Sequence, residues 1–176
     1  PLTGTLDPRA ARAALGPATR VVLGLPLGGH PGGLDELAAL ARDHALHFGI
    51  DAAHGPDVGG ATGAMARMAD FVGLRFYASK NITTGAGGAI LLRDESSAAR
   101  LRRLRVHGMD RASRERDGAR RPWDYDVTEI GRKANLPDLA AALGRAQLAR
   151  RDDFAAQRQH IVTRYRAGLD DLEALA

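Results

Sequence analysis

Hydrophobic positions in the first part of the chain switch between the runs typical of buried strands and the spacing typical of an amphipathic helix. Continuous apolar stretches over 19–25 and 46–50 predict two buried strands. Between them, the segment 34–45 carries apolar residues at helical spacing and predicts a helix. Strand, helix and strand within about thirty residues predict a βαβ unit with parallel strands and a right-handed connection. Its ligand edge lies at the carboxyl ends of the strands, where Asp51 follows the second strand.

Caps, turns and further apolar runs predict the remaining elements. Asp7 and Pro8 predict the start of a short helix that reaches about Leu15, because proline suits the first helical position. The other expected elements are, in chain order, loops over 26–33 and 55–63, strands over 71–77 and 87–92, a helix capped by Asp94 or Ser96 through about Val106, an irregular segment over 108–126, and a helix capped by Asp138 that continues with few breaks to Leu175.

The predicted elements indicate an α/β protein, and composition favours a globular protein of one domain, or one piece of a larger domain. The chain has 176 residues of which 44% are hydrophobic, and its mean hydropathy is -0.25. It contains no cysteine, which excludes disulfides and thiolate metal sites and fits a reducing compartment such as the cytoplasm. We expect no membrane partner, because no apolar run is long enough to cross a bilayer and no signal peptide is visible. The start at Pro1 suggests that the chain begins inside a longer gene product.

Charge raises the question of nucleic-acid binding, since the net charge is +4 and the pI is about 10.1. Most of the excess lies in 100–121, where leucines at helical spacing predict an amphipathic helix followed by an arginine-rich loop. Aromatic residues that would stack on bases are nearly absent before Trp123. We therefore expect no nucleic-acid partner. The arginine-rich loop is either a solvated surface or a site for a nucleotide diphosphate.

Lysine usage singles out one residue. The chain has 25 basic residues, yet Lys80 and Lys133 are its only lysines. Lys80 lies between two predicted strands, just before the turn Thr-Thr-Gly-Ala-Gly-Gly. An amine that must lose its proton and attack a carbonyl cannot be replaced by a guanidinium, which stays protonated. Lys80 is therefore either a nucleophile that forms an imine or a surface lysine in a turn.

Residues after the second strand suggest what such a lysine would hold. Asp51, at the end of a buried parallel strand, can keep a pyridine nitrogen protonated, or it can simply cap the following turn. Ala52 and Ala53 leave room for a flat ring, and His54 can bond a ring substituent or be a structural histidine. With Lys80, these residues favour a pyridoxal phosphate (PLP) site. No metal site is expected, because His44 and His47 lack a third ligand at zinc spacing.

Several ordered motifs resemble one enzyme family. They are Asp51-Ala-Ala-His54, Ala78-Ser-Lys80-Asn-Ile-Thr-Thr-Gly-Ala-Gly-Gly88, His107-Gly-Met-Asp-Arg111, Trp123-Asp-Tyr-Asp-Val127 and Gly131-Arg-Lys-Ala-Asn135-Leu-Pro-Asp138, followed by Ala141-Ala-Leu-Gly144 and Gln147-Leu148. Together they cover nearly the whole chain and resemble the DegT/DnrJ/StrS family of PLP-dependent sugar aminotransferases. The resemblance implies fold type I, the aspartate aminotransferase type, with a mostly parallel sheet. It also implies that residues 1–176 are a partial PLP-binding large domain, without the family's N-terminal segment, and that the helix from about residue 138 leads toward an absent small domain.

The resemblance further implies roles for individual residues. Lys80 holds PLP through its amine, Asp51 pairs with the pyridine nitrogen, and His54 lies near the ring's 3-oxygen. Asn135 matches the asparagine that reaches the cofactor phosphate from the neighbouring subunit of a homodimer with a shared active site. Arg75 stands where the family usually has a phosphate-binding serine, and either binds the phosphate through its fork or crowds the pocket.

The activity that the resemblance implies is transfer of an amino group from glutamate or glutamine to a keto group of a nucleotide-linked deoxysugar. Such a reaction belongs to the biosynthesis of cell-surface polysaccharides or natural-product sugars. A sugar dehydratase of the same fold is an alternative, although in the family that activity goes with histidine in place of Lys80. A non-catalytic binding or regulatory domain is another. It is favoured by Arg75 and by the missing segments. Another departure from the family pattern is Ala86, which replaces a frequent glutamate.

Overall fold

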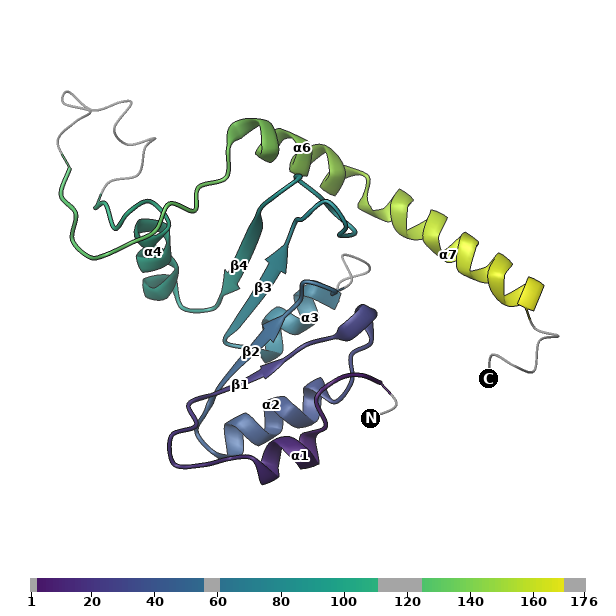
Figure 1. The fold of residues 1–176 in the computed structure, drawn as a ribbon, viewed down its shortest axis with the longest axis horizontal. Coiled ribbons are helices and arrows are strands. Elements are labelled where there is room, and N and C mark those ends of the chain that lie inside the picture. The colour runs from purple at the N-terminus through teal and green to yellow at the C-terminus, as the bar shows by residue number, and fades with distance from the viewer. Residues whose placement is uncertain (1–2, 56–60, 111–124, 170–176) are drawn as a thin grey trace.

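The computed structural model describes residues 3–55, 61–110 and 125–169, and a four-stranded sheet lies at its centre (Figure 1). The order of its strands is β1-β2-β3-β4, with bounds Val21–Gly24, His47–Asp51, Phe71–Arg75 and Gly88–Leu92. As predicted, β1 and β2 are parallel. β3 is parallel to β2, whereas β4 runs antiparallel to β3. The carboxyl ends of β2 and β3 therefore meet at one edge, and the chain leaves that edge toward β4.

Helices surround this sheet unevenly. α2 packs against β1 and β2, α1 packs against α2, α3 contacts β3 and α4 contacts β4. α7 extends away from the sheet after α6 (Figure 1). Across the described ranges, no helix is both long enough and apolar enough to cross a membrane. The bounds are Pro8–Ala13 for α1, Leu34–Asp43 for α2, Ala61–Met68 for α3, Glu95–Leu104 for α4, Asp138–Ala149 for α6 and Arg151–Leu169 for α7, with a short 3-10 turn η1 at Leu27–Gly29.

The hydrophobic core lies on one face of the sheet. Ile50 and Val72 are both 0% exposed and pack with Leu37 of α2 and Met65 of α3. On the opposite face, Val21, Leu23 and Ile90 are 46%, 52% and 56% exposed. The prediction of a buried first strand is therefore wrong for alternate residues of β1, because α2, which packs on β1, covers only the face on which Val22 lies.

Most predicted elements are present, with shifted ends. α3 was missed, and its first residues lie in the expected loop 55–63; Gly63 weakens the helical pattern, and burial of Met65 and Ala69 compensates. Asp138 is the first residue of α6 and not its cap, since Pro137 occupies the N-cap position without a side-chain hydrogen bond. The predicted C-terminal helix is divided at Arg150 into α6 and α7. The expected arginine-rich loop over 111–121 and the helix end at 170–175 lie outside the described residues.

Asp94 caps α4, as one of the two predicted alternatives requires. Its carboxylate accepts hydrogen bonds from the Ser96 hydroxyl at 2.6 Å and from the Ser97 backbone N–H at 2.7 Å. The Ser96 bond, followed by those from the hydroxyl and backbone of Ser97, lowers the pKa of Asp94 from its ordinary 3.8 to about 2. A charged carboxylate is thus the form that holds the start of this helix.

The Asp94 cap predicts a pH dependence of stability. Because the pKa is depressed in the folded state, the contribution of the charged form is present above pH 3.8 and disappears as the pH falls through about 2. Asp94→Asn keeps an acceptor but does not titrate. We expect the difference in unfolding free energy between the native protein and this variant to shrink between pH 3.8 and 2 in urea titrations. A difference that stays constant over that range would contradict the assignment.

Burial of Ile50 predicts a large effect on stability. Ile50→Ala leaves a cavity under α2 and α3 and should lower the free energy of unfolding by about 2–5 kcal/mol. The matched control is Ile130→Ala, because Ile130 is 98% exposed and should change stability by less than about 0.5 kcal/mol. Denaturant unfolding followed by circular dichroism measures both. Equal effects of the two variants would show that the core is not centred on β2.

Candidate active site

A cavity of about 310 Å³ opens where β2 and β3 end. Its lining includes Ala52, Ala53, His54, Arg75, Ser79 and Lys80. The cavity is at the small end of the range of about 300–1,000 Å³ that is usual for small-molecule sites. Parallel pairing of β2 and β3 accounts for the arrangement, because it brings the residues after Asp51 next to those after Arg75. Of the six site residues predicted from sequence, the structure groups Ala52, His54, Arg75 and Lys80 here.

Lys80 lies within the connection 76–87, which its own hydrogen bonds close into a loop. The carbonyl of Phe76 accepts hydrogen bonds from the backbone N–H of Thr84 at 3.0 Å and from the hydroxyl of Thr83 at 3.3 Å. The N–H of Phe76 donates to the carbonyl of Gly87 at 2.8 Å. Lys80 is half-buried, whereas Ser79 and Asn81 beside it are exposed. Lys80 is therefore held at the cavity by an ordered loop between two strands.

Asp51 lies at the same sheet edge but is not among the residues that line the cavity. Its side-chain oxygen Oδ1 accepts a hydrogen bond from the N–H of Ala53 at 2.9 Å, which is the turn-capping role noted as an alternative. In the sheet register Asp51 is opposite Gly73, which has no side chain to fill the space beside it. A carboxylate has about four acceptor positions. The hydrogen bond that caps the turn therefore leaves the Asp51 carboxylate able to accept a further hydrogen bond.

The two predicted phosphate contacts lie in different places. Arg75 lines the Lys80 cavity, is exposed, and has its guanidinium 5.2 Å from the ring centroid of Tyr77. Asn135 instead lines a groove of about 1260 Å³ between β3, β4, α4 and the segment 130–137. The structure therefore does not bring Asn135 to the Lys80 cavity of its own chain. A contact from a neighbouring subunit, as the family resemblance implies, stays a prediction.

His44 and His47, which the sequence analysis considered as metal ligands, have partners within the chain. Ring nitrogens of His44 and His47 are each 3.3 Å from a partner, Arg12 Nη1 and Asp70 Oδ2 respectively. In the described part of the chain, no group of three or more His, Cys, Asp or Glu side chains is arranged to hold a metal ion.

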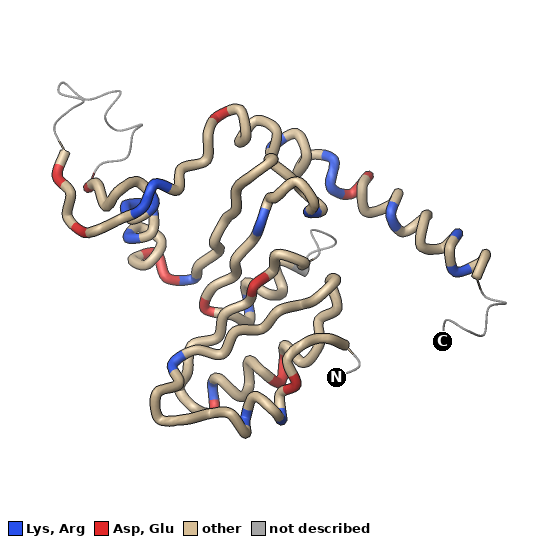
Figure 2. Tube along the Cα trace, viewed as in Figure 1, with Lys and Arg blue, Asp and Glu red and all other residues tan. Residues whose placement is uncertain are grey.

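Lysine and arginine gather at α4 and the neighbouring segment that contains Lys133 (Figure 2).

Part of this basic cluster is neutralised within the chain. Glu129 accepts a charged hydrogen bond from Arg100 at 2.9 Å, and its other oxygen is 3.5 Å from Arg103. Arg102 pairs with Glu95 at 2.7 Å. α4 therefore does not present the continuous stripe of unpaired basic side chains that nucleic-acid binding would require. The predicted contact between the loop 111–121 and a nucleotide lies outside the described residues.

Comparison with known proteins decides the family. The DegT/DnrJ/EryC1/StrS aminotransferase family matches the chain over residues 1–176. The chain belongs to this family. Its members use pyridoxal phosphate, and the sheet, the mostly parallel topology and the long C-terminal helix are those of a fold type I PLP-dependent transferase. The resemblance and the fold class inferred from the sequence motifs are thus confirmed.

Individual relatives have names that refer to polysaccharide biosynthesis, sugar amino transfer or a sugar product. Spore coat polysaccharide biosynthesis protein SpsC from Bacillus subtilis is 35% identical over 173 residues, which are 98% of this chain and 44% of SpsC. The PLP form of the putative sugar aminotransferase Spr1654 from Streptococcus pneumoniae superposes with a TM-score of 0.79 at 25% identity, covering 95% of this chain and 45% of Spr1654. DesI, solved in the presence of its TDP-sugar product, gives a TM-score of 0.73 at 32% identity, covering 97% of this chain and 41% of DesI. The chain thus spans less than half the length of these relatives.

The residues around the cavity are chemically suited to pyridoxal phosphate. Lys80 provides an amine for the aldehyde, and the small side chains of Ala52 and Ala53 leave space for a flat ring. Arg75 provides a fork of N–H donors for a phosphate, and Asp51 is an acceptor at the strand end. The donor set and the size of the cavity therefore fit the group that the family uses.

Sequence reasoning missed how α6 contributes to this region. The side-chain oxygen of Gln147 accepts a hydrogen bond from the backbone N–H of Thr83 at 3.3 Å. Gly144 is buried against Thr84, since a Cβ at residue 144 would be 2.8 Å from the Cγ2 of Thr84. The only sequence signal was that Gly144 and Gln147 belong to the motifs of the resemblance. Their spacing by itself indicated only a shared helix face.

The buried Thr84 hydroxyl predicts a measurable contribution to the stability of the Lys80 loop. Thr84 is 7% exposed and its Oγ1 donates to the carbonyl of Ala86 at 2.7 Å. Thr84→Val keeps the shape but removes the donor, and should lower the free energy of unfolding by about 1 kcal/mol. Thr163→Val is the matched control, because the exposed Thr163 bonds only the preceding turn of α7. Thermal unfolding should distinguish the two, and an unchanged Thr84 variant would contradict this role.

Proposed function

We propose that the protein is a PLP-dependent sugar aminotransferase, or the PLP-binding part of one. The observation that carries the proposal is Lys80 at a cavity shared with Ala52 and His54, in a chain of this family. The amino donor is glutamate or glutamine, and the acceptor is a keto group on a nucleotide-linked deoxysugar. The nucleotide is supported by DesI, whose structure was solved with a TDP-sugar product. A place in polysaccharide biosynthesis is supported by the name of SpsC.

Each residue has a role in this proposal. Lys80 binds the cofactor aldehyde through its amine, and Asp51 holds a proton on the ring nitrogen. Ala52 and Ala53 lie against the ring, and His54 donates a hydrogen bond to the 3-oxygen. Arg75 binds the phosphate in its own subunit, and Asn135 reaches it from the neighbouring subunit of a homodimer. Bound PLP supplies an electron-withdrawing ring that stabilises negative charge developing at the α-carbon of the amino donor.

Lys80 then acts a second time as a base and an acid. With PLP bound, the free amine of Lys80 would take a proton from the α-carbon of the donor and return it to the C4′ carbon of the cofactor, two bonds away. This task requires the amine to stay within about 3 Å of both positions, so the orientation of the 76–87 loop matters as much as its chemistry. The half-burial of Lys80 beside the cavity supports the proposal, because it places the side chain where a bound substrate would be partly shielded from water. A cytoplasmic location fits the absence of cysteine.

Substitution of Lys80 tests the proposal directly. Incubation with PLP followed by borohydride reduction should leave a phosphopyridoxyl group on the peptide that contains Lys80, detected by mass spectrometry. Lys80→Ala should abolish the adduct and lower the rate of amino transfer from glutamate to a keto nucleotide sugar by at least about 10²–10⁴-fold. Lys133→Ala is the matched control, because Lys133 is the other lysine of the chain and does not line the cavity.

The outcomes separate the proposal from its alternatives. An adduct on Lys133 as readily as on Lys80 would show nonspecific modification and remove the catalytic claim. Release of a dehydrated sugar in place of an aminated one would indicate a dehydratase. Binding of a nucleotide sugar in calorimetry without any PLP adduct would indicate a non-catalytic binding domain.

A further inference from the structure

The loop that carries Lys80 is tied to both C-terminal helices as well as to its own strands. On one side, Gln147 of α6 accepts from the backbone N–H of Thr83 at 3.3 Å. On the other, Nη2 of Arg158 in α7 donates to the carbonyl of Asn81 at 3.1 Å. Asn81 directly follows Lys80, and Thr83 comes two residues later. Helices distant in sequence therefore hold the backbone on the carboxyl side of the lysine.

The α6 contact is close and partly shielded from water. Gly144 is buried, and the approach of α6 depends on it because any Cβ there would be 2.8 Å from Thr84 Cγ2. Gln147 lies one turn further along the same face of the helix and is half-buried. The hydrogen bond from Thr83 is therefore less exposed to competing water than a surface contact. A shielded backbone N–H that loses its acceptor is costly.

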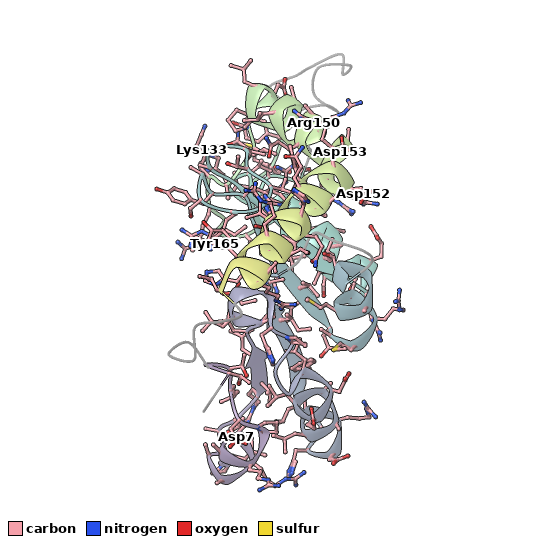
Figure 3. The ribbon with its side chains drawn as sticks, turned by 90° about the vertical axis from the view of Figure 1, so that its right-hand side faces the viewer. Asp7, Lys133, Arg150, Asp152, Asp153 and Tyr165 are labelled. Carbon is pink, nitrogen blue, oxygen red and sulfur yellow. The ribbon has the colours of Figure 1, made fainter. Side chains whose placement is uncertain are left out.

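The α7 contact is exposed and is held by an aromatic side chain. The guanidinium of Arg150 is 4.9 Å from the centroid of the Phe154 ring, and the guanidinium of Arg158 is 5.9 Å from it. Figure 3 shows Arg150 at the junction of the two helices, with Asp152 and Asp153 at the start of α7. Because Arg158 is surrounded by solvent, its bond to Asn81 contributes less than the α6 contact. Gln147 is therefore the residue on which the attachment of the loop mainly depends.

We infer that Gln147 is a positioning residue for Lys80, acting through the N–H of Thr83 and not by touching the cofactor. The inference rests on the proposed function for the role of Lys80, while the hydrogen bond itself does not. The hydroxyl of Thr83 donates to the carbonyl of Phe76, and its N–H donates to the side-chain oxygen of Gln147. Two hydrogen bonds in different directions therefore hold Thr83. Removal of the Gln147 acceptor frees the N–H of Thr83 and lets the backbone segment before Thr83 rotate. The amine of Lys80 then points into the cavity for a smaller fraction of the time.

Two substitutions of Gln147 separate hydrogen bonding from packing. Gln147→Leu fills a similar volume without an acceptor, whereas Gln147→Glu keeps a side-chain oxygen that can accept from Thr83. In Gln147→Leu we expect hydrogen exchange of the Thr83 amide, measured by NMR, to be about three- to tenfold faster. The borohydride-trapped PLP adduct on Lys80 should form more slowly by a similar factor. Gln147→Glu should restore both, and Gln157→Leu, at an exposed position of α7, is the matched control.

The readouts distinguish this inference from the proposed function. Unchanged Thr83 exchange in Gln147→Leu would overturn the inference even if Lys80 still reacts with PLP. Equal defects in the Leu and Glu variants would also overturn it, because packing and not an acceptor would then be responsible. A native protein that forms no adduct would contradict the proposed function. Thr83 exchange with rescue by Gln147→Glu would then still decide whether Gln147 holds the loop.

Discussion

The carbonyl of Phe76 is the point on which the candidate site depends. It accepts from both Thr83 and Thr84, and these two hydrogen bonds close the segment between β3 and β4 into a defined loop. A backbone carbonyl with two acceptor positions used by neighbouring residues leaves the intervening chain little freedom. Lys80 lies between these ends, so the closed loop fixes where its backbone lies beside the cavity.

Parallel pairing supplies the second half of the site. Because β2 and β3 run in the same direction, Ala52 and His54 emerge at the edge where the Phe76 loop begins. The buried residues Ile50 and Val72 hold this register, since a slip of either strand by one residue would turn its buried side chain toward the opposite face. The core therefore does more than stabilise the domain. It also determines which polar residues share the cavity.

The uncovered face of the sheet accords with the length of the chain relative to its family. Val21, Leu23 and Ile90 are apolar side chains that this face leaves exposed to water, and Ile90 lines the same groove as Asn135. Exposed apolar side chains on alternate positions are typical of a surface that other elements cover. The chain spans 44% of SpsC.

Local patterns in the sequence determined the βαβ unit, the Asp94 cap, the place of Lys80 between two strands and the family. They did so because caps, glycine turns and apolar periods act over a few residues. Tertiary structure decided the rest. It showed that α3 forms despite Gly63, that β1 is buried on one face, that Asp51 caps a turn at the edge of the cavity, and that Asn135 lies elsewhere. The bond between Thr83 and Gln147 belongs to the same class, because a contact between residues 64 positions apart leaves no periodic signal along the chain.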